Sequence, residues 1–556
     1  MLQIKDLDER LKRQKREAEE NDAKRRAEKD GLGYLDLIST KVPTEIKAMV
    51  LVPEKEAKAA RLVPLQLVRK TLIVAVFDPN ETGAKEIVEN LKKNYEVKLV
   101  VSSLSGLEHA WNYYQYVSEQ KEISGSVNID EAKIREIQGN IKNLEDLTAI
   151  IKKFDSPYVS QILEIILSGA MALGASDIHL EPNEKFGELR LRIDGLLHSV
   201  FSEFNPLIYK SVITRIKLLS NLMLNVQDQP QDGRFTITLK DRSIEIRTSL
   251  IPSEYGETAV LRLLDPSSLK VNLEDLGWRA DDLAIVDAEI NKPNGLILNT
   301  GPTGSGKTTT LYAFLRKVAR PEIKIITVED PIEYHLAGIS QTQVDPLAGY
   351  TFASGLRSIL RQDPNVILVG EIRDKETAEI ALNASLTGHI VFSTIHTNDA
   401  VGAIPRLLDL GIQTNILGPS LSLIIAQRLV RRLCPNCKTK KAPDSGLETK
   451  VKKLVAALPV RVKKGDYEKL NIYETRGCEK CGGLGYKGRT SIFELLRIDE
   501  EMESAIYKNP TEIELKELAK KQGMVTMQED GLLKVLTGVT SFDEVERLTG
   551  QIIWPA

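Results

Sequence analysis

Gly301-Pro302-Thr303-Gly304-Ser305-Gly306-Lys307-Thr308-Thr309-Thr310 is the stretch that decides the fold of this chain. It fits the phosphate-loop pattern G-x-x-x-x-G-K-[ST]. An apolar run at 295–300 suits a buried strand before the loop, and 309–320 after it has apolar residues at helical spacing. The pattern requires this strand–loop–helix order, and a plain glycine-rich turn before a helix is the alternative. We therefore predict a site for a nucleoside triphosphate.

The parts of this loop suit a bound triphosphate. Glycines let the main chain close around phosphates, so that N–H groups at the helix N-terminus point at them. We expect the Lys307 ammonium to reach the β- and γ-phosphates and the Thr308 hydroxyl to ligate Mg²⁺. The residues predicted to bind ATP are Gly301, Pro302, Thr303, Gly304, Ser305, Gly306, Lys307, Thr308 and Thr309.

Length and composition indicate a soluble protein of about three or four domains. Of its 556 residues, 42% are hydrophobic and 28% charged, as in globular proteins. The net charge of −3 provides no overall field for a polyanion, so nucleic acid is not an expected partner. No apolar run approaches the ~18 residues that span a bilayer, and the N-terminus lacks the apolar core of a secretory signal. We expect a cytoplasmic protein with peripheral membrane association.

The four cysteines form two C-x-x-C pairs, Cys434/Cys437 and Cys478/Cys481. In a cytoplasmic chain, such pairs indicate zinc before a disulfide, and two pairs can close a structural Cys₄ site. The 40 residues between the pairs exceed the spacing of a compact ribbon, so we expect an insertion between two zinc knuckles. Buried free thiols and a redox dithiol are the alternatives.

Composition and periodicity divide the chain into seven parts. The first is highly charged, which is typical of a solvated helix or a disordered arm. Strands alternate with helices in the α/β parts. The predicted parts are a charged arm (1–30), a small α/β domain (31–120), a linker (121–150), a second α/β domain (151–270), a phosphate-loop domain (271–430), a zinc-binding segment (431–490) and a helical C-terminal region (491–556).

Two acidic segments are candidates for the hydrolytic half of the site, because a phosphate loop alone does not hydrolyse ATP. Residues 365–371 are an apolar strand ending at Glu371, a Walker B pattern with Glu for the usual Asp, so a water molecule can lie between it and Mg²⁺. In the acidic turn 328–333, Glu329 or Glu333 can accept a proton from the attacking water. A solvated turn with a helix-capping acid is the alternative for this second segment.

His389 and His396 bracket an apolar strand. A lone histidine is more often a core or surface residue than a catalytic one. Two histidines near strand ends that carry nucleotide chemistry favour a functional interpretation. We predict that both belong to the catalytic site.

These blocks resemble the secretion ATPases, and within them the type II secretion and type IV pilus assembly ATPases. The phosphate loop, 328–333, 369–374 and 387–398 are similar to the family's Walker A, Asp box, Walker B and His box. Further matches lie at 176–182 and 190–195, which resemble the signature of the family's N2 domain, and at 427–429 and 485–489. The similarity extends from about residue 30 to 550. It implies a multidomain α/β protein with a P-loop (RecA-like) core, a PAS-like N2 domain and a small N1 domain.

The resemblance also implies a homohexameric ring that holds ATP between the N2 and P-loop domains. In the family, N2 arginines reach the γ-phosphate. By motif position these are Arg247 and Arg262, with Arg234 a weaker candidate, although single arginines in strands are usually surface charges. The family's catalytic glutamate falls in the Asp box, where Glu333 is favoured over Glu329.

The function implied by the resemblance is a motor ATPase that acts on an inner-membrane platform protein to assemble a type IV pilus or a type II secretion pseudopilus. Retraction ATPases of the family lack the large N-terminal domain and the zinc cysteines, which are both present here. A nucleic-acid translocase could use the basic residues between 428 and 441, but the net negative charge weighs against it. A regulatory module without turnover is disfavoured by Glu333, Glu371 and the two histidines.

Overall fold

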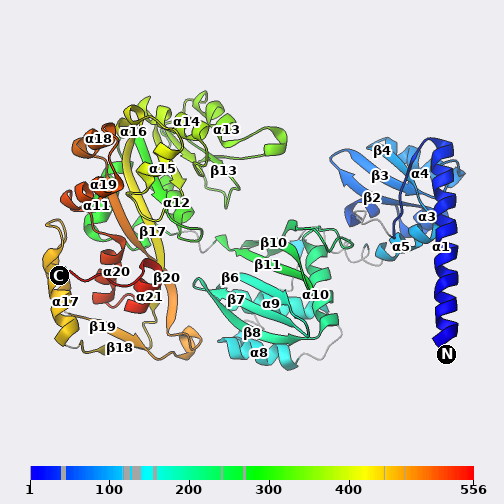
Figure 1. Cartoon of the computed structure of the whole chain (residues 1–556), viewed down its shortest axis with the longest axis horizontal. Coiled ribbons are helices and arrows are strands. Elements are labelled where there is room, and N and C mark those ends of the chain that lie inside the picture. Colours follow the sequence, from blue (N-terminus) through cyan, green and yellow to red (C-terminus); the bar gives the residue numbers. More distant parts are fainter. Residues whose placement is uncertain are drawn as a thin grey trace. The chain divides into compact units, whose positions relative to one another are not determined.

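A computed structural model describes most of the chain, which divides into two compact units, Met1–Asp265 and Pro266–Ala556 (Figure 1). Most of the predicted linker, including Ser124 and Gly125, lies outside the described residues. Among the described helices, none combines the length and the apolar character needed to cross a membrane. The described residues are 2–38, 45–114, 117, 126–127, 139–153, 159–239, 242–266, 271–443, 445–468 and 470–555.

The first part of the N-terminal unit is a small α/β domain preceded by a long helix. Its sheet has the order β1-β4-β3-β2, with β2 antiparallel to β3 and the other pairs parallel. The elements are α1 (Leu2–Asp30), β1 (Gly33–Tyr34), α2 (Ile46–Met49), α3 (Glu54–Ala59), β2 (Leu62–Val68), β3 (Thr71–Val76), α4 (Thr82–Lys92), β4 (Glu96–Val101) and α5 (Leu104–Trp111).

Helix α1 differs from the predicted solvated arm in its second half. Ala23 and Ala27 are buried, and the Glu20 carboxylate accepts hydrogen bonds from the hydroxyls of Tyr34 and Ser103, each at 2.7 Å. The helix therefore packs on this domain through small side chains and one buried acid, although its sequence is highly charged.

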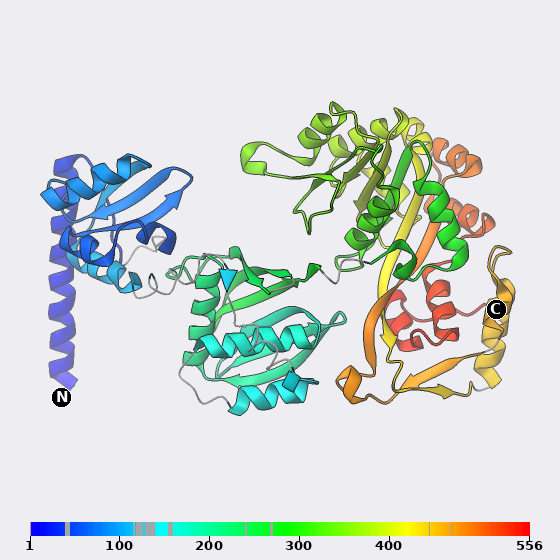
Figure 2. The same ribbon diagram turned by 180° about the vertical axis from the view of Figure 1, so that it is seen from behind.

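The second part of the N-terminal unit is a mostly antiparallel sheet with helices on one face. The strand order is β5-β9-β10-β11-β6-β7-β8, and α8, α9 and α10 contact it (Figure 2). Helix α8 begins inside the predicted linker, and its Leu147 and Ile151 are buried, so this segment belongs to the domain. The elements are β5 (Ser126–Val127), α8 (Leu144–Lys153), α9 (Val159–Ala172), β6 (Ala175–Pro182), β7 (Gly187–Ile193), β8 (Leu196–Phe204), α10 (Pro206–Leu219), β9 (Gln231–Thr238), β10 (Ser243–Ser253) and β11 (Gly256–Leu264).

The C-terminal unit is built on a seven-stranded sheet of order β14-β13-β15-β16-β12-β17-β20. All neighbours are parallel except β17 and β20, which pair antiparallel. The elements up to β17 are α11 (Ala280–Ile290), β12 (Gly295–Thr300), α12 (Lys307–Val318), β13 (Ile325–Glu329), β14 (Ser340–Gln343), α13 (Phe352–Leu360), β15 (Val366–Val369), α14 (Lys375–Leu386), β16 (Ile390–Ile395), α15 (Ala403–Asp409), α16 (Thr414–Ser420) and β17 (Leu421–Leu433).

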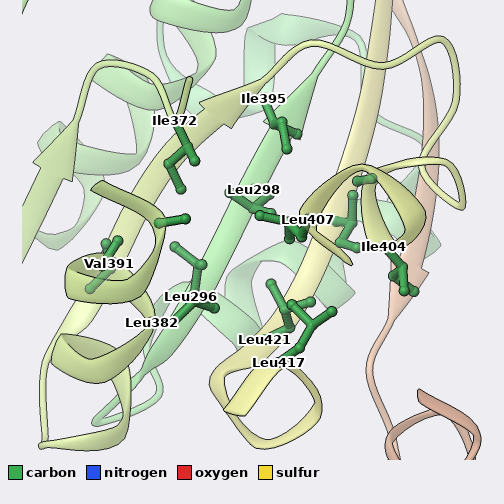
Figure 3. Packing of buried hydrophobic residues seen from close by; sticks show 14 of the residues in the cluster. Leu296, Leu298, Ile372, Leu382, Val391, Ile395, Ile404, Leu407, Leu417 and Leu421 are labelled. Carbon is green, nitrogen blue, oxygen red and sulfur yellow. The ribbon is translucent and has the colours of Figure 1, made fainter. Parts of the chain in front are cut away.

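Both faces of this sheet are covered, as expected for parallel strands that read as continuous apolar runs. Leu296 and Leu298 of β12 point to the face covered by α13–α16, where Leu382, Leu407 and neighbouring side chains complete the core (Figure 3). Ile297 lies on the opposite face, in the core formed with α11 and α12. The sheet is therefore a rigid platform for the loops at its edge.

The zinc segment is an insertion between two strands of the main sheet. Because β20 belongs to this sheet, the phosphate-loop domain extends beyond the predicted limit at residue 430 and includes part of the region predicted to be helical. In Figure 1, β17 and β20 continue past the other strands toward β18 and β19. The remaining elements are β18 (Lys438–Lys441), α17 (Ser445–Ala457), β19 (Ile472–Thr475), β20 (Tyr486–Arg497), α18 (Glu500–Tyr507), α19 (Glu512–Lys521), α20 (Met527–Leu536) and α21 (Phe542–Thr549).

Candidate active site

The carboxyl ends of the parallel strands bring the predicted nucleotide residues to one edge of the sheet. Strand β12 leads into Gly301, β15 into Glu371 and β16 into His396. Because β12, β16 and β15 are consecutive neighbours, these three positions lie along the same edge. Ligands of open α/β sheets bind at this edge, where the loops are free to approach them.

The phosphate loop has the backbone geometry that its glycines were predicted to provide. Gly301 and Gly306 adopt φ values of 148° and 93°. A Cβ on Gly301 would lie 2.6 Å from the carbonyl oxygen of Gln427, and one on Gly306 would lie 2.8 Å from Nε2 of the same residue. Neither position has room for a side chain, because β17 packs directly against the loop. Glycine at both positions lets the main chain make this close contact. Helix α12 starts immediately afterwards, at Lys307.

The Lys307 side chain folds back over the phosphate loop. Its Nζ donates to the carbonyl oxygens of Gly301, at 2.7 Å, and Pro302, at 3.1 Å. Burial lowers the pKa of Lys307 to about 8; the charge of Arg428 acts in the same direction, and that of Glu371 opposes it. The hydroxyl-bearing Thr308 is exposed on the first turn of α12, where a metal ion could reach it.

Glu371 and His396 form an acid–imidazole pair beside Lys307. Glu371 Oε2 lies 3.6 Å from His396 Nε2, and its Oε1 lies 2.5 Å from the Arg373 guanidinium. Burial, followed by the charge of Lys307, lowers the pKa of His396, and Glu371 opposes this shift. The imidazole is therefore neutral near pH 7 and can accept a proton or a hydrogen bond from a water molecule.

The two Asp-box glutamates occupy different environments. Glu329 is 3% exposed at the end of β13, and its carboxylate accepts hydrogen bonds from Tyr312, Thr327 and Gln341. These three donors hold it inside the protein, which favours a structural role. Glu333 lies in the following loop and is only half-buried. Glu333 is therefore the stronger candidate for the general base, and this assignment remains a prediction.

The structure separates the two histidines that were predicted to act together. His396 follows the carboxyl end of β16, whereas His389 precedes the amino end of the same strand. The ring of His389 contacts the carbonyl oxygen of Ala384 through Nδ1, at 3.0 Å, and its main-chain carbonyl accepts from Gly295. His389 thus lies at the opposite edge of the sheet from the phosphate loop. Its position does not fit the predicted catalytic role, because the apolar run alone did not fix which strand end carries the chemistry.

Sequence reasoning did not identify Gln427 and Arg428 as parts of the site. Gln427 Oε1 accepts from Asn299, at 3.0 Å, and from Thr310, at 2.9 Å, so it joins β17 to both sides of the phosphate loop. Arg428 is half-buried and lies beside Gly301, because a Cβ on that glycine would be 3.1 Å from its Nη1. The only sequence signal was the short match at 427–429.

In the N-terminal unit, the candidate arginines lie in one row across the antiparallel sheet. Arg234, Arg247 and Arg262 are consecutive cross-strand partners on β9, β10 and β11. Such partners share a face of the sheet. The row continues to Asp177 on β6, which pairs with Arg262 at 2.8 Å and with Arg192 at 3.4 Å. Asp177 and Arg192 are further members of this row that sequence reasoning did not select.

The four cysteines gather at the far end of the β17–β20 hairpin. Their sulfur atoms all lie within 4.8 Å of one another, with Sγ–Sγ distances of 3.8 Å for Cys434–Cys478, 3.9 Å for Cys437–Cys481 and 3.7 Å for Cys478–Cys481. A tetrahedral zinc ion with Zn–S bonds of ~2.3 Å places its ligands ~3.8 Å apart. A disulfide would need about 2.05 Å. The donor set therefore fits a structural zinc ion.

Main-chain hydrogen bonds favour the thiolate form of one cysteine in this cluster, and the thiolate is the form that binds a metal ion. Burial alone would raise the pKa of Cys481. Backbone N–H groups of Cys478 and Gly485 donate to its sulfur, each at 3.2 Å, and these bonds contribute to lowering that pKa to about 7. The predicted insertion between the knuckles is also present, as β18, α17 and β19.

Comparisons with known proteins agree with this arrangement. The model described as type II/IV secretion system protein matches residues 152–547, and the MshEN domain model matches residues 31–121. The chain is 40% identical over 505 residues to type II secretion system protein E of Dickeya dadantii, which covers 90% of this chain and 97% of that one. The chain belongs to the type II/IV secretion system protein family.

The chain is also similar to a pilus assembly protein, and its fold is similar to that of a solved ATPase structure. The chain is 38% identical over 503 residues to the type IV pilus assembly ATPase PilB of Myxococcus xanthus, covering 89% of this chain and 85% of that one. The solved structure of the ATPase DotB of Yersinia pseudotuberculosis matches with a TM-score of 0.50 at 19% identity, covering 70% of this chain and 92% of that chain. The latter likeness concerns the fold.

As a member of the type II/IV secretion system protein family, the chain is an ATP-hydrolysing enzyme that uses ATP and Mg²⁺. The relatives that it matches over most of its length are secretion and pilus assembly proteins, which favours assembly or secretion over the retraction alternative. The four-cysteine cluster is compatible with zinc in addition. These conclusions agree with the class of enzyme that the phosphate loop predicted.

The basic residues between 428 and 441 are partly exposed to solvent, and several of them make specific contacts. Arg431 pairs with Glu544 at 2.7 Å, and Lys441 pairs with Glu474 at 3.1 Å. Lys438 donates to the carbonyl oxygen of Gly538 at 2.8 Å. Arg431 and Lys438 are half-buried in these contacts, whereas the Lys441 side chain is 62% exposed. The secretion and pilus assembly relatives, and not this segment, weigh against a nucleic-acid translocase.

Proposed function

We propose that this protein is a homohexameric motor that hydrolyses ATP to drive assembly of a type IV pilus or a type II secretion pseudopilus. The observation that supports this most strongly is the phosphate loop joined to Lys307, Glu371 and His396 at one sheet edge, in a chain whose relatives in both systems align over nearly its full length. The partner in this proposal is an integral membrane platform protein, contacted peripherally from the cytoplasm.

Each residue of the site has a proposed role. Main-chain N–H groups from Gly301 to Gly306 bind the phosphates, Lys307 neutralises their charge and Thr308 ligates Mg²⁺. Glu371, with His396 beside it, would help to hold Mg²⁺, and Glu333 would accept the proton of the attacking water. The four cysteines would hold a zinc ion at the end of the β17–β20 hairpin, and this ion would supply no catalytic step, because a Cys₄ site has no open coordination position.

Arg247 and Arg262 are proposed to stabilise the charge that develops on the γ-phosphate. In the described structure, both already lie on one face of their sheet, and Arg262 is more than half exposed while paired with Asp177. Alanine at either position should lower the hydrolysis rate and leave ATP binding intact. A removed charge contact of this kind typically costs ~10²-fold or more in rate.

The motor proposal can be tested by joining assembly state, hydrolysis and partner binding in one preparation. Light scattering should show a six-subunit species, and the specific ATPase activity should rise with the fraction of that species. The same preparation should retain an integral membrane protein of a pilus or secretion system in a pull-down from detergent-solubilised membranes. An active monomer would contradict the ring. Capture of DNA, lost at higher salt, would favour the translocase instead.

A further inference from the structure

The Arg428 guanidinium contacts the main chain of its own strand, β17, and the main chain of the loop after His396. Its Nη1 donates to the carbonyl oxygen of Gln427, at 3.2 Å, beside the first turn of the phosphate loop. Its Nη2 donates to the carbonyl oxygen of Asn398, at 3.0 Å, two residues after His396. One planar guanidinium thus spans the gap between β17 and the loop that carries the histidine.

The same loop is held from two further directions. The Thr397 N–H donates to the Thr300 hydroxyl at 2.8 Å, at the end of the strand that leads into the phosphate loop. The Ala400 N–H donates to the buried Glu494 carboxylate of β20 at 2.9 Å. These contacts anchor the loop after His396, and one of them comes from the charged guanidinium of Arg428. Lys516 also lies 3.5 Å from the carboxylate of Asp399 in this loop. Hydrogen bonds with a charged partner are about twice as strong as neutral ones.

Among the described residues, no carboxylate forms an ion pair with Arg428, although the charges of Glu494 and Asp399 favour its charged form. Its two described hydrogen bonds go to neutral carbonyl oxygens, although burial opposes the charged form. A half-buried guanidinium on neutral acceptors costs desolvation energy that two such bonds offset only in part. A side chain that reached the solvent would avoid this desolvation cost. The half-buried position of the Arg428 guanidinium beside the phosphate loop therefore favours a role in the site.

We propose that Arg428 is a positioning residue for ATP hydrolysis, which ties the loop after His396 to β17 beside the phosphate loop and thereby sets the place of His396 beside Glu371. The inference rests on the proposed function, because it assigns Arg428 to the site proposed to hydrolyse ATP. Small displacements of catalytic groups are costly: ~1 Å can lower a rate ~10²-fold. Loss of the bridge should therefore act on turnover more than on ATP binding.

The test compares Arg428→Gln and Arg428→Lys in the full-length assembled protein. Arg428→Gln should lower kcat ~10-fold or more and change the KM and the dissociation constant for ATP less than ~3-fold. Lysine keeps the charge but donates from a single point and lacks the planar fork that spans two carbonyls. Arg428→Lys should therefore recover little of the lost kcat. Arg432→Gln, an exposed arginine of the same strand, is the matched control and should behave like the wild type.

Three outcomes would overturn this role. A normal kcat in Arg428→Gln removes it altogether. Full recovery in Arg428→Lys shows that charge, and not the bridge, matters. A loss confined to ATP affinity makes Arg428 a ligand-binding residue. If Arg428→Gln failed to fold, Arg428→Lys would carry the test, with low kcat at normal ATP affinity expected. An inactive wild-type protein would instead contradict the proposed function, so the two failures are distinguishable.

Discussion

Glu371 and His396 face each other from the carboxyl ends of the adjacent strands β15 and β16, with 3.6 Å between Oε2 and Nε2. The pair lies next to Lys307, whose charge helps to lower the pKa of the imidazole. A neutral imidazole beside a carboxylate can hold a water molecule through a hydrogen bond. The Walker B and His-box segments therefore contribute neighbouring side chains to the site proposed to hydrolyse ATP.

Glu371→Gln should retain ATP binding and lose hydrolysis by ~10²-fold or more, because the amide lacks the negative charge that orients metal-bound water. His396→Ala should lower kcat by a smaller factor, ~10-fold. Steady-state ATPase assays with a fluorescent-nucleotide binding measurement would separate the two effects. His389→Ala is the matched control, because this histidine lies at the other edge of the sheet. Equal losses at His389 and His396 would show that the effect is not local.

The two Asp-box glutamates should respond differently to substitution. Glu333→Gln should bind ATP and turn over poorly, because it loses a proton acceptor, and its melting temperature should stay near the wild-type value. Glu329→Ala should lower the free energy of unfolding by ~1–3 kcal/mol, since Tyr312, Thr327 and Gln341 would lose a buried acceptor. Turnover and thermal denaturation measured on both variants test this. Near-normal turnover in Glu333→Gln would make Glu329 the base.

Several parts of the site were predictable from local sequence because they depend on short-range geometry. The phosphate loop needs glycines with positive φ, and Gly301 and Gly306 supply them within one motif. The cysteine pairs likewise place two ligands in each turn. The apolar runs of β12, β15 and β16 identified buried parallel strands, and their carboxyl ends located Glu371 and His396.

Other parts depend on long-range pairing, which a single sequence does not specify. Arg428 reaches the loop of Asn398 only because β17 pairs with β12. Asp177 and Arg262 are 85 residues apart and meet across β6 and β11. Strand β20 lies beyond the zinc insertion, so its membership in the main sheet could not be read from local alternation.

ATP affinity should depend on pH through Lys307. The free protein has a Lys307 pKa of about 8, and a bound polyphosphate raises it by favouring the charged form. Below about pH 8, the Lys307 ammonium of the free protein is already charged. Its titration therefore does not change the affinity for ATP in that range. Above that pH, binding takes up a proton, and affinity should fall up to ~10-fold per pH unit. Calorimetry between pH 7 and 9 measures this, and Lys307→Arg should be flat over the same range. An identical slope in both proteins would exclude Lys307 as the source.

Zinc should stabilise the end of the β17–β20 hairpin without taking part in hydrolysis. Elemental analysis of reduced protein should find one zinc ion per chain, and all four cysteines should react with a thiol reagent only after chelation. Cys481→Ser should lose the metal and lower the melting temperature, while ATP binding persists. Protein that contains no zinc and whose thiols react freely would contradict the Cys₄ assignment.

The measurement that tests the central claim most directly is steady-state ATP hydrolysis by assembled Lys307→Ala protein beside the wild type. The wild type should hydrolyse ATP with Mg²⁺, and the variant should lose at least ~10²-fold of that activity while its assembly and melting temperature are maintained. Unchanged hydrolysis in the variant would contradict the assignment of the phosphate loop as the site of ATP chemistry.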